Sequence, residues 1–224
     1  MPASPPQPGR PRNTSRERIL DMALHLLDHR GPQALTLSTL AAELAMGISS
    51  LYTYFSDLAE LEDEVAARLI GQVPALDAAR GPLRDQLLAF GAAILRMHSV
   101  HPYLRLIAGR ASAVVGARLR RANLAVLMAS GVEAARANDC LEMIHALAYS
   151  GGSELHRLQQ LSAGVRKAVD KIVADEVGAD LVRAAAGDLS VAARHAHLFE
   201  RCIDSLLPEA GQAPGARRRG RRAR

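Results

Sequence analysis

The chain has 224 residues, of which 49% are hydrophobic, enough to bury a sizeable core in one or two domains. No apolar run is long enough to cross a bilayer, and the N-terminal segment lacks the apolar stretch of a signal peptide, so we expect a cytoplasmic protein. The two cysteines, Cys140 and Cys202, are far apart in the sequence and have no partners at metal-ligand spacing. Neither a disulfide framework nor a zinc site is indicated, and we expect buried free thiols.

The net charge of +5 comes from the C-terminal end, where six arginines lie among the last eight residues. Without these six arginines the charge of +5 falls to −1, so the rest of the chain is nearly neutral and bulk charge does not indicate nucleic-acid binding. We expect residues 208–224 to be a disordered Arg-rich tail. Additional contacts to DNA phosphates and a solvated charge run are both open interpretations of it.

The N-terminal part predicts a disordered arm followed by three helices. Residues 1–14 are proline-rich and lack apolar periodicity. From about Ser15 an apolar stripe predicts a first helix that ends at Gly31–Pro32. Thr36 can cap a second helix, whose stripe is interrupted at Ala45–Gly47 before a third, short helix. The pattern is a helix, a tight turn and a helix.

The third helix carries an aromatic cluster, Tyr52, Tyr54 and Phe55, after a run of small and polar residues. Helical periodicity turns Ile48, Leu51 and Phe55 toward the core and leaves hydroxyl groups outside. A helix-turn-helix lays its second helix in the major groove, and a helix N-terminus favours phosphate. The alternative is that the aromatics only fill a small helical bundle. The residues predicted to contact DNA are Thr36, Gly47, Ile48, Ser49, Ser50, Tyr52, Thr53 and Tyr54, with Arg16 and Arg18 of the first helix.

The span from about Ser15 to Leu61 resembles the tetracycline-repressor-type (TetR) transcription regulators. The matching residues are Arg18-Ile19-Leu20, Ala23, Gly31, Thr36, Leu40-Ala41, Leu51-Tyr52, Tyr54-Phe55 and Leu61. The resemblance implies an all-α fold with a three-helix helix-turn-helix domain over 15–61. It also implies a helical ligand-binding and dimerisation bundle over 62–207.

Two positions depart from the family pattern. Ala45 stands where the family usually has a turn glycine, so that its backbone is strained if its φ is positive. Leu58 stands where a lysine usually opens the fourth helix, which removes one phosphate contact.

The remainder of the chain predicts further helices, and no segment alternates like a strand. A fourth helix begins near Leu58 and ends at Gly71, and another follows Gly81–Pro82 and ends before His101–Pro102. A short helical piece is predicted over 103–107 and a continuous helix over 111–136.

Two long C-terminal helices, over 140–161 and about 190–207, carry wide apolar stripes. Adjacent glycines, Gly151 and Gly152, interrupt the first, and either close approach of another helix or a kink would explain them. The family resemblance implies that such helices pair with their copies in a four-helix dimer interface, although an intramolecular core is the simpler alternative. The candidates for the interface are Ile144, Ala148, Gly151, Gly152, Leu155, His195, Leu198, Phe199 and Cys202.

An effector pocket is predicted among the central helices, where apolar residues have polar neighbours, although most of these are expected to be ordinary core. The candidates are Phe90, Ile94, Met97, His98, Tyr103, Met128, Met143 and Tyr149. Such a lining suits a mainly apolar ligand with one or two hydrogen-bonding groups.

No catalytic constellation, cofactor motif or metal site is indicated. The histidine pairs are two or three residues apart, and the run from Ser150 to Ser153 follows no strand. The sequence therefore predicts a homodimeric, ligand-responsive repressor, not an enzyme, that binds a palindromic operator and is released by a small molecule. The alternative is a helical interaction protein whose basic tail binds nucleic acid without specificity.

Overall fold

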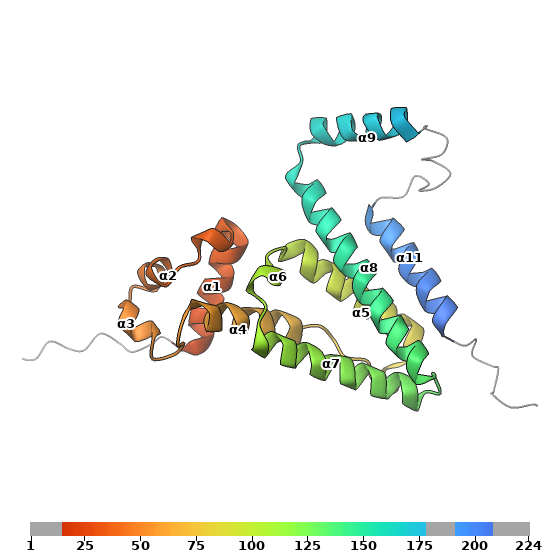
Figure 1. Cartoon of the computed structure of the whole chain (residues 1–224), viewed down its shortest axis with the longest axis horizontal. Helices are drawn as coiled ribbons and strands as arrows, with labels where there is room; N and C mark the ends of the chain where they lie inside the picture. The colour runs from red at the N-terminus through yellow and green to blue at the C-terminus, as the bar shows by residue number, and fades with distance from the viewer. Residues whose placement is uncertain (1–14, 178–190, 208–224) are drawn as a thin grey trace, which may run out of the picture. The chain divides into compact units, whose positions relative to one another are not determined.

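A computed structural model describes residues 15–177 and 191–207, and every regular element in these ranges is helical (Figure 1). The all-α prediction is confirmed. No helix in the described ranges is both long and apolar enough to span a membrane. The predicted arm over 1–14 and the Arg-rich tail lie outside the described residues.

Two compact units divide the chain. The N-terminal unit comprises residues up to 72 together with 103–116, and the C-terminal unit comprises 73–102 and the residues from 117 onward. This division differs from the expected boundary after residue 61, because helix α4 and the later segment 103–116 pack with the N-terminal helices.

The helices of the N-terminal unit begin and end at the residues that the sequence predicts. The Oγ of Ser15 accepts a hydrogen bond from Arg18 N (3.2 Å) at the start of α1, and Gly31, with a φ of 80°, ends it. Asp57 caps α4 by accepting from Glu60 N (2.8 Å). The elements are α1 (Arg16–Arg30), a 3-10 turn (Pro32–Ala34), α2 (Leu37–Glu43), α3 (Ile48–Leu51), α4 (Leu58–Gly71), α6 (Leu104–Ile107) and the start of α7 (Arg110–Ala129).

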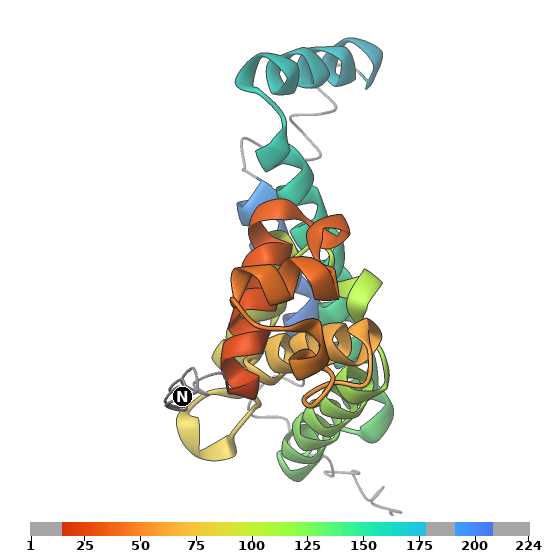
Figure 2. The ribbon, with the colours of Figure 1, turned by 90° about the vertical axis from the view of Figure 1, so that its left-hand side faces the viewer.

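Helix α1 forms the centre of this unit, since it packs against both α2 and α4. Its apolar stripe is completely buried, as are the facing leucines of the other two helices: Ile19, Ala23, Leu26, Leu40 and Leu61. This core fixes α2 and α3 as an exposed pair on one side of α1 (Figure 2).

The C-terminal unit is built around α8, which packs against α5 and α11. Its elements are a 3-10 turn (Ala78–Arg80), α5 (Leu83–Val100), the remainder of α7, α8 (Ala134–Gln160), α9 (Ala163–Val177) and α11 (Val191–Leu206). The continuous helix predicted over 111–136 is wrong: α7 ends at Ala129, Gly131 adopts a φ of 87°, and Glu133 caps α8. Helix α9 was not predicted; it begins just after the end of α8 at Gln160 and runs in a new direction (Figure 1).

The adjacent glycines of α8 allow two helices to approach closely, and α8 continues through them unbroken. A Cβ on Gly151 would lie 2.7 Å from His195 Cγ of α11. One on Gly152 would lie 2.6 Å from the carbonyl oxygen of Leu95 and 2.7 Å from His98 Cβ, both in α5. The close-approach alternative is confirmed, and the kink is wrong. We call the packing of α5, α8 and α11 the three-helix seam.

Candidate nucleic-acid interface

The turn between α2 and α3 is a tight helix C-cap followed directly by a new helix. Ala45 adopts a φ of 50°, so the condition under which its backbone was expected to be strained is met. Met46 N donates to Ala41 O (2.9 Å) and Ala45 N to Ala42 O (3.1 Å), the paired bonds of a Schellman motif. This left-handed residue redirects the chain within three positions, and as alanine it carries about 1 kcal/mol of strain.

Helix α2 begins as predicted at Thr36, whose side chain remains exposed at the edge of the helix pair. Its Oγ1 accepts from Thr39 N (3.0 Å) and shares a second hydrogen bond with Thr39 Oγ1 (2.9 Å). The cap therefore leaves a pair of hydroxyl groups at the start of α2, where a helix N-terminus favours anions.

Helix α3 is a single turn that presents its outer side to solvent. Gly47, Ser49 and Ser50 are exposed, as are Tyr52 and Thr53 of the following turn. Beneath them Leu51 and Phe55 are almost completely buried. The arrangement gives a small-residue, hydroxyl-bearing face on a fixed apolar base.

The prediction that Ile48 turns toward the core is wrong, because its side chain is 41% exposed. Ile48 is the first residue of α3, and a helical side chain covers the turn that precedes it, where α3 has only the exposed chain reversal. Ile48 therefore joins the outer face of the helix pair, where an apolar side chain can contact a thymine methyl group.

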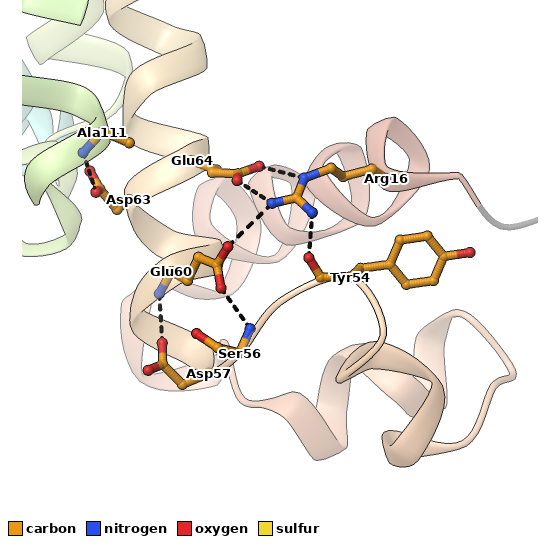
Figure 3. A network of polar contacts seen from close by, with 8 residues as sticks. All are labelled: Arg16, Tyr54, Ser56, Asp57, Glu60, Asp63, Glu64 and Ala111. Atoms are coloured by element: carbon orange, nitrogen blue, oxygen red, sulfur yellow. Dashed lines mark hydrogen bonds and ion pairs between the residues drawn. The ribbon is translucent and has the colours of Figure 1, made fainter. Parts of the chain in front are cut away.

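Arg16, which the sequence predicts to contact DNA, is engaged in a polar network within the N-terminal unit (Figure 3). Its Nε donates to Glu64 Oε2 (2.9 Å), and its Nη2 pairs with Glu64 Oε1 and, at 3.4 Å, with Glu60 Oε1. Its Nη1 donates to the carbonyl oxygen of Tyr54, and its Cζ lies 4.3 Å from the centroid of the Phe55 ring. Arg16 is a positioning residue that fixes the end of the α3 segment to α1 and α4.

The same network orders the loop between α3 and α4. Ser56 N donates to Glu60 Oε2 (2.6 Å), which complements the cap that Asp57 provides to Glu60. The N–H of Ser56, with a smaller contribution from Arg16, holds the pKa of Glu60 below its ordinary value. With its backbone fixed in this way, Tyr54 directs its ring away from the network (Figure 3).

Other arginines of the unit also pair with carboxylates. Arg30 Nη2 lies 2.9 Å from Glu43 Oε1, and Arg68 Nη1 lies 2.6 Å from Asp21 Oδ1. Arg18 is exposed near the start of α1. Hydroxyl groups therefore dominate the described face of α2 and α3.

Two contacts explain why residues 103–116 belong to this unit. Asp63 of α4 accepts hydrogen bonds from Gly109 N (2.8 Å), Ala111 N (2.6 Å) and Ser112 N (2.9 Å), so that it caps the start of α7. Burial alone would raise the pKa of Asp63, but these three N–H groups outweigh burial and lower it. A Cβ on Gly109 would lie 2.8 Å from Asp63 Cγ, so the contact requires glycine there.

Tyr103 makes the second contact, since its hydroxyl donates to Asp28 Oδ1 of α1. Burial and this hydrogen bond raise the pKa of Tyr103. The prediction that Tyr103 lines the effector pocket is therefore corrected: its side chain is 4% exposed and fastens the α6 segment to α1.

Comparison with known proteins identifies this arrangement. Residues 19–65, which contain α2, the turn and α3, match the family described as bacterial regulatory proteins, tetR family. The match covers this domain and not the rest of the chain, so residues 19–65 resemble the DNA-binding domain of TetR-type regulators. No curated protein sequence matches it.

Solved TetR-family structures share the fold over most of the chain. Streptomyces coelicolor ActR in complex with actinorhodin has 21% identity and a TM-score of 0.70, covering 90% of this chain and 99% of its own. Another TetR regulator of that organism has 18% identity and a TM-score of 0.64, covering 86% and 97%. A single-substitution variant of TetR from Acinetobacter baumannii in complex with minocycline has 17% identity and a TM-score of 0.59, covering 86% and 96%.

The residues predicted to line the TetR-type effector pocket do not form one group. Phe90 and Ile94 are buried in the core of the C-terminal unit, and Met97 is partly buried against it. The ring of His98, also buried, meets that of Tyr149 edge-on with centroids 5.0 Å apart. The prediction is wrong for Met128 and Met143, which are 50% and 46% exposed because they lie on the outer sides of α7 and α8.

Most residues predicted for the dimer interface lie inside the three-helix seam. They are buried within one chain, where α8 packs against α5 and α11, and so are not exposed to a second copy. This correction applies to Ile144, Ala148, Gly151, Gly152, His195, Phe199 and Cys202. Leu155 is partly buried, and Leu198, at 41% exposure, lies on the outer side of α11. The intramolecular alternative accounts for the apolar stripes.

Proposed function

We propose that this chain is a homodimeric transcription repressor that binds a palindromic operator through α2 and α3 and leaves it when a small molecule binds. The observation that carries the proposal is the exposed hydroxyl face of α3 above the buried Leu51 and Phe55. Within a TetR-family domain, this face supports docking in the major groove, with the buried pair fixing its orientation.

The hydroxyl groups of α3 differ in what they can recognise. Ser49 and Ser50 are exposed and can donate or accept at base edges. Thr53 Oγ1 donates to Ser50 O (2.7 Å), so that it remains available to bases only as an acceptor. We assign phosphate contacts to Tyr52, Tyr54 and Arg18, which would position the face without specifying sequence.

A second copy would pack on the outer sides of α8 and α11. Both helices pack against α5 on their inner sides. On their outer sides the large apolar side chains of Met143 and Leu198 are exposed. A two-fold contact through these sides would place two recognition helices in one dimer, as a palindromic operator requires.

Effector responsiveness is supported by the fold relatives that hold ligands, actinorhodin in ActR and minocycline in the Acinetobacter baumannii TetR variant. We propose a mainly apolar effector for this chain, bound near Phe90, Met97 and Tyr149. Asp63 ties α4 to the first turn of α7, and α7 continues into the C-terminal unit. A ligand that binds one position of α7 better would shift the population of α4 positions with it.

Selection of the purified protein against random duplex DNA tests the proposal. We expect a two-fold symmetric consensus, and the same consensus after deletion of residues 208–224, because tail contacts to phosphate carry no direct sequence information. Binding without any consensus, abolished by the deletion, would instead establish the alternative of a helical protein with a non-specific basic tail.

A further inference from the structure

The two cysteines of the chain lie on neighbouring helices of the three-helix seam. Cys140 is on α8 and Cys202 is on α11, and both are buried, with 1% and 5% exposure. Helices α8 and α11 pack directly against each other (Figure 1). Two positions separated by more than sixty residues are therefore brought to one interface, although neither takes part in the proposed DNA or effector contacts.

The register of α8 and α11 places the two cysteines opposite each other. Gly151 meets His195, whereas Ile144 and Phe199 meet at the same point of α5, since both contact a Cβ built on Gly91 at 3.2 and 3.3 Å. Moving back along α8 therefore moves forward along α11, as in an antiparallel pair. One further helical turn in each direction reaches Cys140 and Cys202.

The surroundings of the pair are apolar and closed to water. Ile144 and Ile203, one turn from Cys140 and next to Cys202, are completely buried. Burial raises the pKa of Cys140 to about 12, with a smaller contribution from Cys202, and burial also raises the pKa of Cys202. Both groups are thus thiols at neutral pH, and oxidation proceeds only through the small thiolate fraction.

We propose that Cys140 and Cys202 form an oxidisable dithiol, which an organic hydroperoxide converts into an intramolecular disulfide between α8 and α11. The thiolate of one cysteine attacks the peroxide oxygen, giving a sulfenic acid and an alcohol after proton transfer. The second thiolate then attacks the sulfenic sulfur, and hydroxide leaves as water after protonation. The two sulfurs lose two electrons in total, the hydroperoxide gains them, and α11 becomes covalently fixed to α8.

The test measures how strongly the native fold favours the disulfide. The full chain is equilibrated with mixtures of reduced and oxidised glutathione, with and without urea, and the intramolecular disulfide is quantified by mass spectrometry after the thiols are blocked. If the two thiols face each other, their effective concentration in the folded protein should exceed that in urea at least tenfold. An equal or lower value in the folded protein would overturn the proposal.

Cumene hydroperoxide then serves as the oxidant, with a matched control for register. The parent should lose both titratable thiols and two mass units without forming intermolecular dimers. The control combines Cys202→Ser with Ser205→Cys, which keeps two cysteines and a similar loop length but moves one to a residue not on the buried face. Circular dichroism confirms that the control is folded. A control that forms the disulfide as readily as the parent would contradict the register and the proposal.

Discussion

The N-terminal unit and the three-helix seam solve helix packing in different ways. Polar side chains that reach between helices, such as Arg16 to Glu64 and Asp63 to the start of α7, fix the N-terminal unit around its apolar core. In the seam, glycines bring helix backbones together and apolar side chains fill the remaining space. A change in the first region should therefore alter recognition while the chain stays folded, whereas a change in the second should alter folding itself.

The largest effect is expected from Phe199→Glu, and its comparison with Leu198→Glu distinguishes a position inside the seam from one on the surface of the same helix. Phe199 is 3% exposed, so an unpaired carboxylate there should destabilise the chain by about 3–5 kcal/mol. The neighbouring Leu198→Glu alters an exposed residue and should change the free energy of unfolding by less than about 1 kcal/mol while weakening the dimer. Urea melts and light scattering distinguish the two. A Phe199→Glu variant that is folded but monomeric would contradict the placement of Phe199 inside the three-helix seam and would place it at the dimer interface.

The glycines of α8 provide the next test. Gly152→Ala would place a Cβ 2.6 Å from the Leu95 carbonyl oxygen and should destabilise the protein by about 1–3 kcal/mol. Gly116→Ala in α7 is the control, because a Cβ there meets nothing within 4 Å and alanine favours helix by about 1 kcal/mol. The two substitutions should shift urea midpoints in opposite directions. A stabilising Gly152→Ala would show that α5 does not approach α8 closely at this point.

Asp63→Asn should weaken the connection between α4 and α7 in a pH-dependent manner. Losing the charged cap should cost about 1–2 kcal/mol at pH 7. Because the folded protein lowers the pKa of Asp63, its contribution is complete above the unfolded value, about 3.9, and is lost as pH falls through the folded value. Unfolding free energies of parent and variant should therefore converge below about pH 4. If the difference in unfolding free energy between parent and variant did not depend on pH, the charge of Asp63 would not contribute to stability.

Arg16→Gln tests whether this arginine positions α3 or contacts DNA. As a positioning residue it should lower thermal stability by about 1 kcal/mol and weaken operator binding, with the salt dependence of binding unchanged. A direct phosphate contact would instead reduce the slope of log K against log salt by about 1 and leave stability intact. Titrations at several salt concentrations, alongside thermal melts, separate these results.

Ala45→Gly should produce the smallest effect. Ala45 has a φ of 50°, so glycine should stabilise the turn by up to about 1 kcal/mol, less the conformational freedom that glycine adds to the unfolded chain. Denaturant melts measure the change. A variant less stable than the parent would indicate that the alanine is accommodated there without strain.

Local signals predicted the elements better than the contacts between them. The caps at Ser15 and Thr36 each depend on residues three positions away, so the sequence contains the whole pattern. Ala45 was identified through the family resemblance, and its positive φ followed. By contrast, the partner of Arg16 lies 48 positions along the chain, which no local pattern reveals.

The apolar stripe of α11 illustrates the same limit in the C-terminal unit. Its spacing shows that Phe199 must be covered but does not specify whether α5 of the same chain or a second copy covers it. The paired glycines carried more information, because their cost in a helix called for either a close neighbour or a kink, and the structure has the close neighbour. Asp63 had no signal at all, since its three donors come from a segment 46 to 49 positions later.

The central claim is that the exposed face of α3 recognises specific bases, and a paired selection tests it most directly. Random duplex DNA is selected with the parent and with the Ser49→Ala, Ser50→Ala double variant, which alters two exposed side chains without disturbing the buried Leu51 and Phe55. We predict a two-fold symmetric consensus for the parent and a relaxed preference at the same positions of both half-sites for the variant. An identical consensus and affinity for both proteins would contradict the claim.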